Sequence, residues 1–440
     1  MNLDAKVQTI NRKSVTLPKI ITLMKHLLVV MLAAVTLMSG CSSEDEDTFT
    51  TDPVTPRTPR TVMVYMTAEN NLSGNAYSDI NEMMRASADI PDGSNLVVFV
   101  DRASSTELPF VATISNGEIV KDDRFSPEED FISTDPKRMR ETLRWMMDHY
   151  PAEDYGLVLW GHSSGWIFST DSIATDDAPA GKMHRAYGWD TGNNSQGGTG
   201  KWINIPTLAD VLESLPHKLK FIFADCCNFQ TAETAFELRH AADYIIASPA
   251  ETPACGAPYD KLIVPLFDDK DDFYKGIADT YNAMTVNRDD RVPMAVVRTS
   301  EMERLAVATK DVVRLMAAKG QTVTDDVIYY RTHATRSSIK IMFDANDIIR
   351  KNIGDEHPEA YQQWKSAFDN AVIYRATSTK WLTAYPIDFG FDTTGEYYGG
   401  MSMFVPLDVY DTPGCSYNQD IRRTEWYWAA GFDNHYAGSE

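Results

Sequence analysis

Basic residues are scarce in this sequence. Its 440 residues include 41 Lys and Arg against 63 Asp and Glu, which gives a formal net charge of -22. A chain this acidic repels the phosphate backbone of DNA and RNA, and it lacks the cations that supply the electrostatic part of nucleic-acid binding. Nucleic acid is therefore excluded as a partner, whereas the same charge favours cationic substrates or the solubility of a secreted protein.

Cysteine is also scarce, with five residues in the whole chain. Beyond the amino-terminal region only Cys226, Cys227, Cys255 and Cys415 remain, which is too few for a fold held together by disulfides. Neither a Cys-x-x-Cys pair nor a His-Glu-x-x-His helix occurs. No metal centre is therefore predicted for catalysis.

The amino-terminal region lacks an apolar run long enough to span a bilayer stably. A basic start at Met24, a short apolar stretch over 27–37 and small residues before Cys41 form a targeting segment, and Met24 is an alternative start of translation. The ending Leu-Met-Ser-Gly-Cys over 37–41 resembles a bacterial lipoprotein box. This resemblance implies a signal segment over 1–40, cleavage before Cys41 and lipidation of its thiol; an ordinary secretory signal is the alternative.

Residues 41–59 follow as an acidic linker that contains Pro53, Pro56 and Pro59 and should be extended and solvated. An acidic stretch directly after a lipidated cysteine resembles a signal for display on the outer surface of some bacteria. We therefore expect the protein in the cell envelope, held by a lipid anchor in the outer membrane and exposed at the surface, or secreted.

From residue 60 onward, apolar strands alternate with amphipathic helices. Asp135-Pro136 begins one helix with an N-cap and a proline at the first helical position. Such alternation predicts an α/β fold with a mainly parallel central sheet between two helical layers over 60–320, followed by a smaller α+β extension over 321–440. The predicted strands are 61–66, 96–100, 156–160, 219–224, 244–247, 293–297, 339–343 and 399–405; the predicted helices include 135–150, 206–215, 231–241, 301–318 and 361–374.

Two of these strands end at residues with catalytic chemistry. His162 follows the apolar strand at 156–160, and Cys226-Cys227 follow the strand at 219–224. Parallel sheets place their chemistry beyond the carboxyl ends of the strands, so a histidine and a cysteine from distant segments can meet there. Between them lies a long loop over 170–201, rich in Asp, Gly, Asn and Ser, which is of the length expected for a functional or disordered segment.

The order and spacing of several segments resemble the clostripain family of cysteine peptidases, relatives of caspases and gingipains. The resemblance covers roughly residues 60–300, with weaker similarity to the end, and implies a caspase-like fold. It is carried by these segments: Tyr65–Leu72, Asp79–Met83, Trp160-Gly161-His162 with Gly165-Trp166, Asp225-Cys226-Cys227, Glu237–Arg239, Ala247–Glu251, Pro258-Tyr259 and Gly400–Pro406.

The resemblance implies a role for each matching residue. Cys227 is the nucleophile and His162 its partner, and Asp225 is the acidic floor of a pocket for the Arg or Lys that precedes the cut bond. It also implies self-cleavage between Arg185 and Ala186, and Ca²⁺ as a stabilising ion. Asp171, Asp176 and Asp177 are the candidate oxygen ligands for this ion, and no cofactor is expected for the chemistry itself.

The residue types fit peptide hydrolysis. A thiolate attacks the carbonyl carbon, and a nearby histidine stabilises the thiolate and protonates the leaving amine. The oxyanion needs N–H donors, for which we expect the backbone of Ser163 and Cys227. Ser163 stands where many family members have glycine. The expected partners are protein or peptide substrates with Arg or Lys at the cut site and, through the lipid anchor, a membrane; the enzyme is expected as a monomer or a self-cleaved two-chain form.

Two alternatives remain open from the sequence. Gly161-His162-Ser163-Ser164-Gly165 matches the Gly-x-Ser-x-Gly elbow of serine esterases, which would make Ser163 the nucleophile. That interpretation requires a helix directly after the elbow and leaves the cysteines unexplained. The other alternative is a surface lipoprotein that keeps the fold but does not catalyse, and Ser163 after the histidine is the feature that favours it.

Overall fold

Five parallel strands form the centre of a nine-stranded sheet, in the order β12-β10-β9-β8-β5-β1-β2-β3-β4. The parallel strands are β1 (Thr58–Ala68), β2 (Asn95–Arg102), β5 (Ala152–Trp160), β8 (Leu219–Asp225) and β9 (Ala242–Ala247). Antiparallel strands extend both edges: β3 (Phe110–Ser115) and β4 (Glu118–Lys121) on one side, β10 (Met294–Arg298) and β12 (Val372–Ala376) on the other. The computed structural model describes residues 58–168, 186–192, 194–284, 291–332, 339–378, 381, 397–411 and 415–434.

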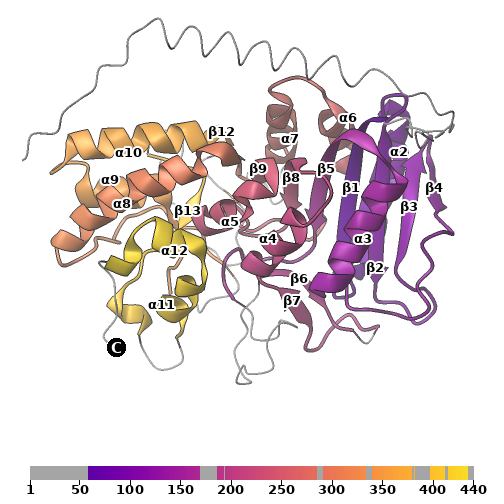
Figure 1. Ribbon diagram of the computed structural model, residues 1–440, viewed down its shortest axis with the longest axis horizontal. Helices are drawn as coiled ribbons and strands as arrows, with labels where there is room; N and C mark the ends of the chain where they lie inside the picture. The colour runs from indigo at the N-terminus through magenta and orange to yellow at the C-terminus, as the bar shows by residue number, and fades with distance from the viewer. Residues whose placement is uncertain are drawn as a thin grey trace, which may run out of the picture. The chain divides into compact units, whose positions relative to one another are not determined.

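Helices cover both faces of this sheet (Figure 1). One face packs against α3 (Pro136–His149), α4 (Ile205–Glu213), α5 (Ala232–Glu237) and α8 (Met302–Ala318). The other face packs against α2 (Ser73–Ala86), α6 (Tyr259–Phe267) and α7 (Phe273–Asn282). The predicted three-layer arrangement with a mainly parallel sheet is confirmed. In β1, Met63 and Tyr65 belong to the first core and Val62 and Val64 to the second, which explains why its sequence is continuously apolar.

Shorter elements complete the described chain. These are the hairpin β6 (Tyr187–Asp190) and β7 (Lys201–Ile203); the pair β11 (Phe343–Asp344) and β13 (Ser402–Met403); α9 (Ala345–Ile353), α10 (Pro358–Ala371), α11 (Tyr417–Asp420) and α12 (Glu425–Ala429); and the 3₁₀ helices η1 (Ser87–Asp89), η2 (Leu238–His240), η3 (Thr299–Glu301), η4 (Asp408–Tyr410), η5 (Ile421–Arg423) and η6 (Phe432–Asn434). None of the described helices combines the length and the apolar composition that a bilayer span requires.

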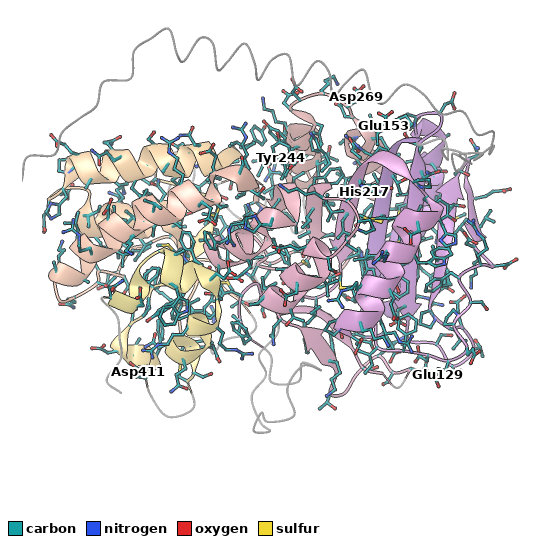
Figure 2. The ribbon with its side chains drawn as sticks, viewed as in Figure 1. Glu129, Glu153, His217, Tyr244, Asp269 and Asp411 are labelled. Atoms are coloured by element: carbon teal, nitrogen blue, oxygen red, sulfur yellow. The ribbon has the colours of Figure 1, made fainter. Side chains whose placement is uncertain are left out.

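Because the five central strands run in the same direction, their carboxyl ends all lie at the same end of the strands. In Figure 2, Glu153 lies at the start of β5, and Glu129, in the loop before α3, lies toward the opposite ends of the strands. In Figure 1, β6 and β7 lie on the same side as Glu129. Ser163, just beyond β5, forms a β-bridge with Tyr187 of β6. The hairpin therefore sits beside the carboxyl ends of the strands, where the sequence predicts the chemistry.

Several predicted elements differ from the structure. The helix predicted to reach Tyr374 ends at Ala371, and 372–376 form β12, whose β-branched and aromatic residues add to the sheet edge. The predicted strands at 339–343 and 399–405 shrink to the two-residue β11 and β13, and the helix predicted to 241 ends at Glu237 before a 3₁₀ turn. Residues 56–440 form one compact unit. The boundary at residue 320 stays a prediction.

Candidate active site

The ends of β5 and β8 are aligned in register. These strands are parallel neighbours, and Trp160 at the end of β5 lies opposite Asp225 at the end of β8. The Gly161 N–H donates to the Asp225 carbonyl at 3.4 Å, so the contact continues one residue further. His162 and Cys227 each follow two residues after the aligned pair. Since neighbouring strands lie about 4.8 Å apart, this alignment brings the two segments together.

Two glycines permit this close approach. Gly161 has φ +143°, and a Cβ there would lie 2.4 Å from Thr67 Oγ1. Gly165 has φ +62°, and its Cβ would lie 2.5 Å from the carbonyl oxygen of Asn228, the residue after Cys227. Both positions are thus restricted to glycine by backbone conformation and by space. The contact of Gly165 with Asn228 shows that the histidine and cysteine segments pack directly against each other.

The imidazole of His162 is held at the surface by polar and aromatic neighbours. Its Nε2 lies 2.7 Å from Asn71 Oδ1, at the start of the segment that leads into α2. Its ring centroid lies 5.4 Å from that of Trp189 and 6.3 Å from that of Trp202. The His162 carbonyl accepts a hydrogen bond from Gly188 N at 2.8 Å. The hairpin β6–β7 and the end of β1 therefore position this side chain together.

The thiol of Cys227 contacts the segment that follows β9. Thr252 N donates to Cys227 Sγ at 3.4 Å, and Thr252 Oγ1 lies 3.6 Å from the same sulfur. Burial raises the pKa of Cys227 to about 11, although the hydrogen bond from the Thr252 backbone acts in the opposite direction. The sulfur is thus a protonated thiol at neutral pH in this state, and nucleophilic attack requires a change that favours the thiolate.

The N–H groups expected to bind the oxyanion are those of Ser163 and Cys227. Ser163 and Tyr187 form a bridge whose two hydrogen bonds come from their neighbours, Ser164 N to Ala186 O at 2.9 Å and Gly188 N to His162 O at 2.8 Å. Ser163 N is therefore left out of this bridge. Among the described residues, neither Ser163 N nor Cys227 N donates a backbone hydrogen bond outside helices and strands.

Asp225 lies behind the cysteine and is buried. Its carboxylate accepts hydrogen bonds from Tyr281 Oη at 2.7 Å, Tyr259 Oη at 2.9 Å and Ala257 N at 3.0 Å. Burial raises the pKa of Asp225 even though all three hydrogen bonds favour the ionised form. The resemblance assigned this residue to the substrate pocket, and here the two tyrosines and the 256–257 backbone enclose it.

A second buried carboxyl group, Asp79 of α2, lies beside Asp225. A Cβ on Gly256 would be 2.3 Å from Asp79 Oδ2 and 3.3 Å from Asp225 Oδ2, so the same backbone touches both groups. Trp160 Nε1 donates to Asp79 Oδ2 at 2.7 Å, while Asp79 Oδ1 is buried without a hydrogen-bond partner. Burial raises the pKa of Asp79 to about 8, and the charge of Asp225 adds to this shift. The acidic region behind Cys227 thus holds two carboxyl groups.

Several predicted sites fall outside the described residues. Cys41, Arg185 and the candidate calcium ligands Asp171, Asp176 and Asp177 are among them. Ala186, on the carboxyl side of the predicted cleavage point, is described and fully buried, and its carbonyl accepts the hydrogen bond from Ser164 N. The residue after the predicted cut is therefore anchored next to the His162 segment.

The structure has no helix directly after Ser163, over the described residues 164–168, although the serine-esterase interpretation requires one there. Residues 164–168 contain turns and irregular backbone, whereas an elbow needs a helix directly after the nucleophile. The Ser163 hydroxyl accepts a hydrogen bond from Gly165 N at 3.0 Å and is mostly buried. This geometry gives Ser163 a role in the turn after β5.

Sequence reasoning assigned no role to four residues that surround the site. Asn71 contacts His162, Thr252 contacts Cys227, and Tyr259 and Tyr281 bind Asp225. Asn71 and Tyr259 belong to segments that carry the family resemblance, which was the available signal. Tyr281 lies in α7, where its spacing is that of an ordinary core residue, so nothing in the sequence distinguishes it.

The chain is similar to a known family of peptidases over most of its length. Residues 64–391 match the model of the clostripain family, peptidase family C11. Clostripain from Hathewaya histolytica is 26% identical over 226 residues, a match that covers 46% of this chain and 41% of clostripain. A secreted C11 cysteine protease from Bacteroides thetaiotaomicron, solved with an irreversible peptide inhibitor, is 27% identical with a TM-score of 0.67 and covers 86% of this chain and 99% of its own. An inactive zymogen C11 protease from Parabacteroides distasonis has the same fold at 23% identity, with a TM-score of 0.66 and coverage of 86% of this chain and 99% of its own.

Proposed function

Because this chain belongs to the clostripain family of cysteine peptidases, we propose that it is an endopeptidase that cuts after arginine or lysine with Cys227 as nucleophile and His162 as acid–base partner. The observation that carries this proposal is the register of β5 and β8, which places both residues two positions beyond the aligned pair Trp160 and Asp225. The contact of Gly165 with Asn228 supports the same pairing.

The proposed reaction begins with loss of the Cys227 proton to His162. The thiolate attacks the substrate carbonyl carbon, and the oxyanion that forms accepts hydrogen bonds from Ser163 N and Cys227 N. The C–N bond then breaks, and the imidazolium gives its proton to the departing amine. Water, deprotonated by the neutral imidazole, hydrolyses the thioester and restores the free thiol. Asn71 holds the imidazole ring in place through its contact with Nε2.

The proposed specificity rests on the acidic region behind the cysteine. Asp225 lies two residues before Cys227, and a carboxylate binds a guanidinium through two parallel hydrogen bonds, which favours arginine over lysine. Asp79 supports this proposal because a cation that enters the region would meet a second carboxyl group. Entry requires movement of the 256–257 backbone or of the two tyrosines, which enclose Asp225 in this state.

The proposal also covers how the enzyme is activated and where in the cell it is held. We expect self-cleavage between Arg185 and Ala186, and the inactive zymogen among the similar structures supports such a step. The described state, with a half-buried, protonated thiol, fits a precursor. Lipidation at Cys41 would hold the protein in the cell envelope with its enzyme domain outside the cytoplasm. A related C11 protease is described as secreted.

One set of variants tests this function. Wild type should hydrolyse an arginyl amide reporter, whereas Cys227→Ala and His162→Ala should lose all measurable turnover and Ser163→Ala should keep most of it. Intact mass and amino-terminal sequencing should show a new terminus at Ala186 in wild type but not in Cys227→Ala. Turnover that survives Cys227→Ala but not Ser163→Ala would instead establish the serine esterase. A folded wild type that hydrolyses no reporter, even after its 170–201 loop is cut by an added protease, would favour the non-catalytic lipoprotein.

A further inference from the structure

Residues 399–404, in the carboxyl-terminal part of the chain, contact both the segment that carries His162 and the segment that carries Cys227. This 399–404 segment contains β13, and every residue of it is buried. It belongs to a stretch that carries the family resemblance but has no part in the proposed reaction. β13 lies against α5, the helix that follows Cys227 in the sequence (Figure 1).

The 399–404 segment binds the turn that follows the proposed nucleophile. Ser402 N donates to the Gln230 carbonyl at 3.0 Å, and Ser402 forms a β-bridge with Thr231. Phe404 N donates to Glu233 Oε1 at 2.8 Å. Glu233 lies in the first turn of α5 and is fully buried. The cysteine segment is therefore held by backbone pairing and by one buried carboxyl group.

Phe404 also contacts the histidine segment. Its ring packs against Trp166 with the centroids 4.8 Å apart, and both side chains are buried. Trp166 directly follows Gly165, where an added Cβ would lie 2.5 Å from the Asn228 carbonyl oxygen. The two segments thus meet once at Gly165 and a second time through Phe404.

A second buried carboxyl group fixes the other end of the 399–404 segment. Asp344 Oδ2 accepts hydrogen bonds from Gly399 N at 2.9 Å and from Gly400 N at 3.1 Å. The Met401 carbonyl accepts one from Ala345 N at 2.9 Å. A Cβ on Gly399 would lie 2.6 Å from Asp344 Oδ1, so the backbone is packed tightly against this carboxyl group. The segment therefore cannot move without breaking buried hydrogen bonds.

We infer that Glu233 is a positioning residue for the catalytic pair: by holding Phe404, it fixes the position of the histidine segment relative to the cysteine segment. This inference rests on the proposed function, because it assumes that His162 and Cys227 act together. Glu233 acts through Phe404 and Trp166 and not on the substrate. Loss of its carboxyl oxygen would leave the Phe404 N–H without an acceptor in the interior, which is costly for a buried donor.

Two variants of Glu233 test this role by kinetics. Glu233→Ala removes the acceptor of the Phe404 N–H, whereas Glu233→Gln keeps a carbonyl oxygen there. Burial raises the pKa of Glu233 to about 7, so the carboxyl group is partly neutral at neutral pH and glutamine is a close substitute. On an arginyl amide, Glu233→Ala should lower kcat about tenfold with KM within about twofold of wild type, and Glu233→Gln should restore most of kcat. Wild-type kcat in a folded Glu233→Ala protein would overturn the inference.

Glu237 provides the matched control. It lies one turn further along α5, is also buried, and accepts a hydrogen bond from Glu425 N of α12 at 2.5 Å, outside the 399–404 segment. Glu237→Ala should therefore lower Tm about as much as Glu233→Ala but leave kcat unchanged. Equal losses of kcat in the two variants would show a structural role only and overturn the inference. Phe404→Leu, which keeps the N–H bond but loses the ring contact with Trp166, should also lower kcat, and it replaces Glu233→Ala should that variant not fold.

Hydrogen exchange in the full-length Cys227→Ala protein tests the coupling without any activity. The Ser164 N–H donates to the hairpin on the histidine side. Glu233→Ala, a change on the cysteine side, should speed its exchange about tenfold, whereas Glu237→Ala should leave it unchanged. Unchanged exchange at Ser164 in Glu233→Ala would overturn the inference. If the coupling is present but wild type cuts no arginyl substrate, the proposed function is refuted and the link between the two segments stands.

Discussion

At the scale of single residues, the protonation states of buried groups decide how the site behaves. Cys227 is enclosed by the segment after β9, and burial raises the pKa of its thiol to about 11. Asp79 is a carboxyl group in an acidic, buried setting, and burial raises its pKa to about 8. Both groups are therefore mainly protonated at neutral pH in this state, and each gives a measurable pH dependence.

The raised pKa of Cys227 predicts slow alkylation of the uncut protein at neutral pH. In Arg185→Ala, which should stay uncut and keeps both His162 and Cys227, the rate at which iodoacetamide modifies Cys227 should rise about tenfold per pH unit between pH 7 and 10, because only the thiolate reacts. Peptide mass spectrometry follows Cys227 separately from the exposed Cys255. A rate at pH 7 equal to that at pH 10 would show that the thiol is already ionised.

Asp79 should make the protein less stable as pH rises. Its native pKa is about 8, whereas the ordinary pKa of an aspartate is 3.8, so between these pH values the native state holds a proton that the unfolded state has lost. Raising the pH from 5 to 8 therefore lowers the free energy of unfolding, by on the order of 4 kcal/mol for this group. Asp79→Asn lacks this titration, and urea unfolding at pH 5 and pH 8 should show a smaller loss of stability in the variant than in wild type.

The control for this experiment is Asp260→Asn, an exposed acid on α6. It should follow the wild-type pH dependence. If Asp79→Asn and wild type lose the same stability between pH 5 and pH 8, the carboxyl of Asp79 is ionised in the native protein over that range.

For single residues, the sequence allowed predictions only where the residue type has catalytic chemistry, as histidine and cysteine do. His162 and Cys227 follow recognisable buried strands, so their approach could be predicted from the order of the elements. Tyr281 and Thr252 are ordinary residue types whose roles depend on contacts with segments far along the chain. Glu233 and Phe404 come from segments far apart in the sequence, and only the three-dimensional fold brings them together.

At the scale of secondary-structure elements, the turn after β5 controls how the segments that carry His162 and Cys227 meet. Gly165→Ala should destabilise the protein by about 3 kcal/mol, because the backbone has φ +62° and the added methyl group would overlap the Asn228 carbonyl. The same overlap should push the His162 and Cys227 segments apart and lower kcat/KM on an arginyl amide. Urea unfolding and steady-state kinetics measure the two effects.

Gly74→Ala is the matched control, since Gly74 lies in α2 and has no atom within 4 Å of an added Cβ. Alanine there should leave activity unchanged and stability equal or slightly higher. Wild-type kinetics in Gly165→Ala would mean that the segments adjust without losing their alignment.

The amino-terminal cap of α3 should affect stability alone. The Asp135 carboxylate accepts hydrogen bonds from Lys137 N at 2.9 Å and Arg138 N at 3.0 Å, as the Asp-Pro pair predicts. Asp135→Ala should cost about 1 kcal/mol of unfolding free energy, whereas Asp135→Asn should cost little, because asparagine is also a good cap. Neither change should alter kcat/KM. Equal stability of Asp135→Ala and wild type in urea unfolding would contradict the role of the cap.

The sequence predicted strands and helices most accurately where a single pattern, such as a continuous apolar run, determines the element. The parallel strands have continuous apolar runs because both faces are buried, and their central parts were predicted. The β3–β4 hairpin was missed because β4 is largely exposed and charged, with little hydrophobic pattern. The end of α10 was misplaced because Val372 to Tyr374 continue an apolar stretch, and pairing with β10 decides that they form a strand.

At the scale of the whole molecule, the predicted cut after Arg185 lies in the sequence between the two residues of the proposed catalytic pair, His162 and Cys227. A cut after Arg185 would place β1 to β5 in one fragment and β6 onward in the other. Yet β5 pairs with β8 along Gly156 to Trp160 in the middle of the sheet, and this pairing is buried on both faces. The cut should therefore leave the sheet intact.

This arrangement predicts a non-covalent two-chain enzyme. The cut wild type should separate into two bands on a denaturing gel without reducing agent, because the described cysteines are free. In size-exclusion chromatography under native conditions it should elute as one species at the volume of the uncut Cys227→Ala protein. Separate elution of the fragments would show that the β5–β8 pairing depends on the intact chain.

The register of β5 and β8 has a practical consequence. The segments of His162 and Cys227 each follow one of these paired strands, and the interval 169–185, which contains the predicted cut, lies between them in the sequence. Replacing this interval with the recognition sequence of a different protease should couple the enzyme to a chosen trigger. A set of such variants would give proteases that are each activated by one chosen protease. The turnover of each variant would then report the activity of the protease that cuts it.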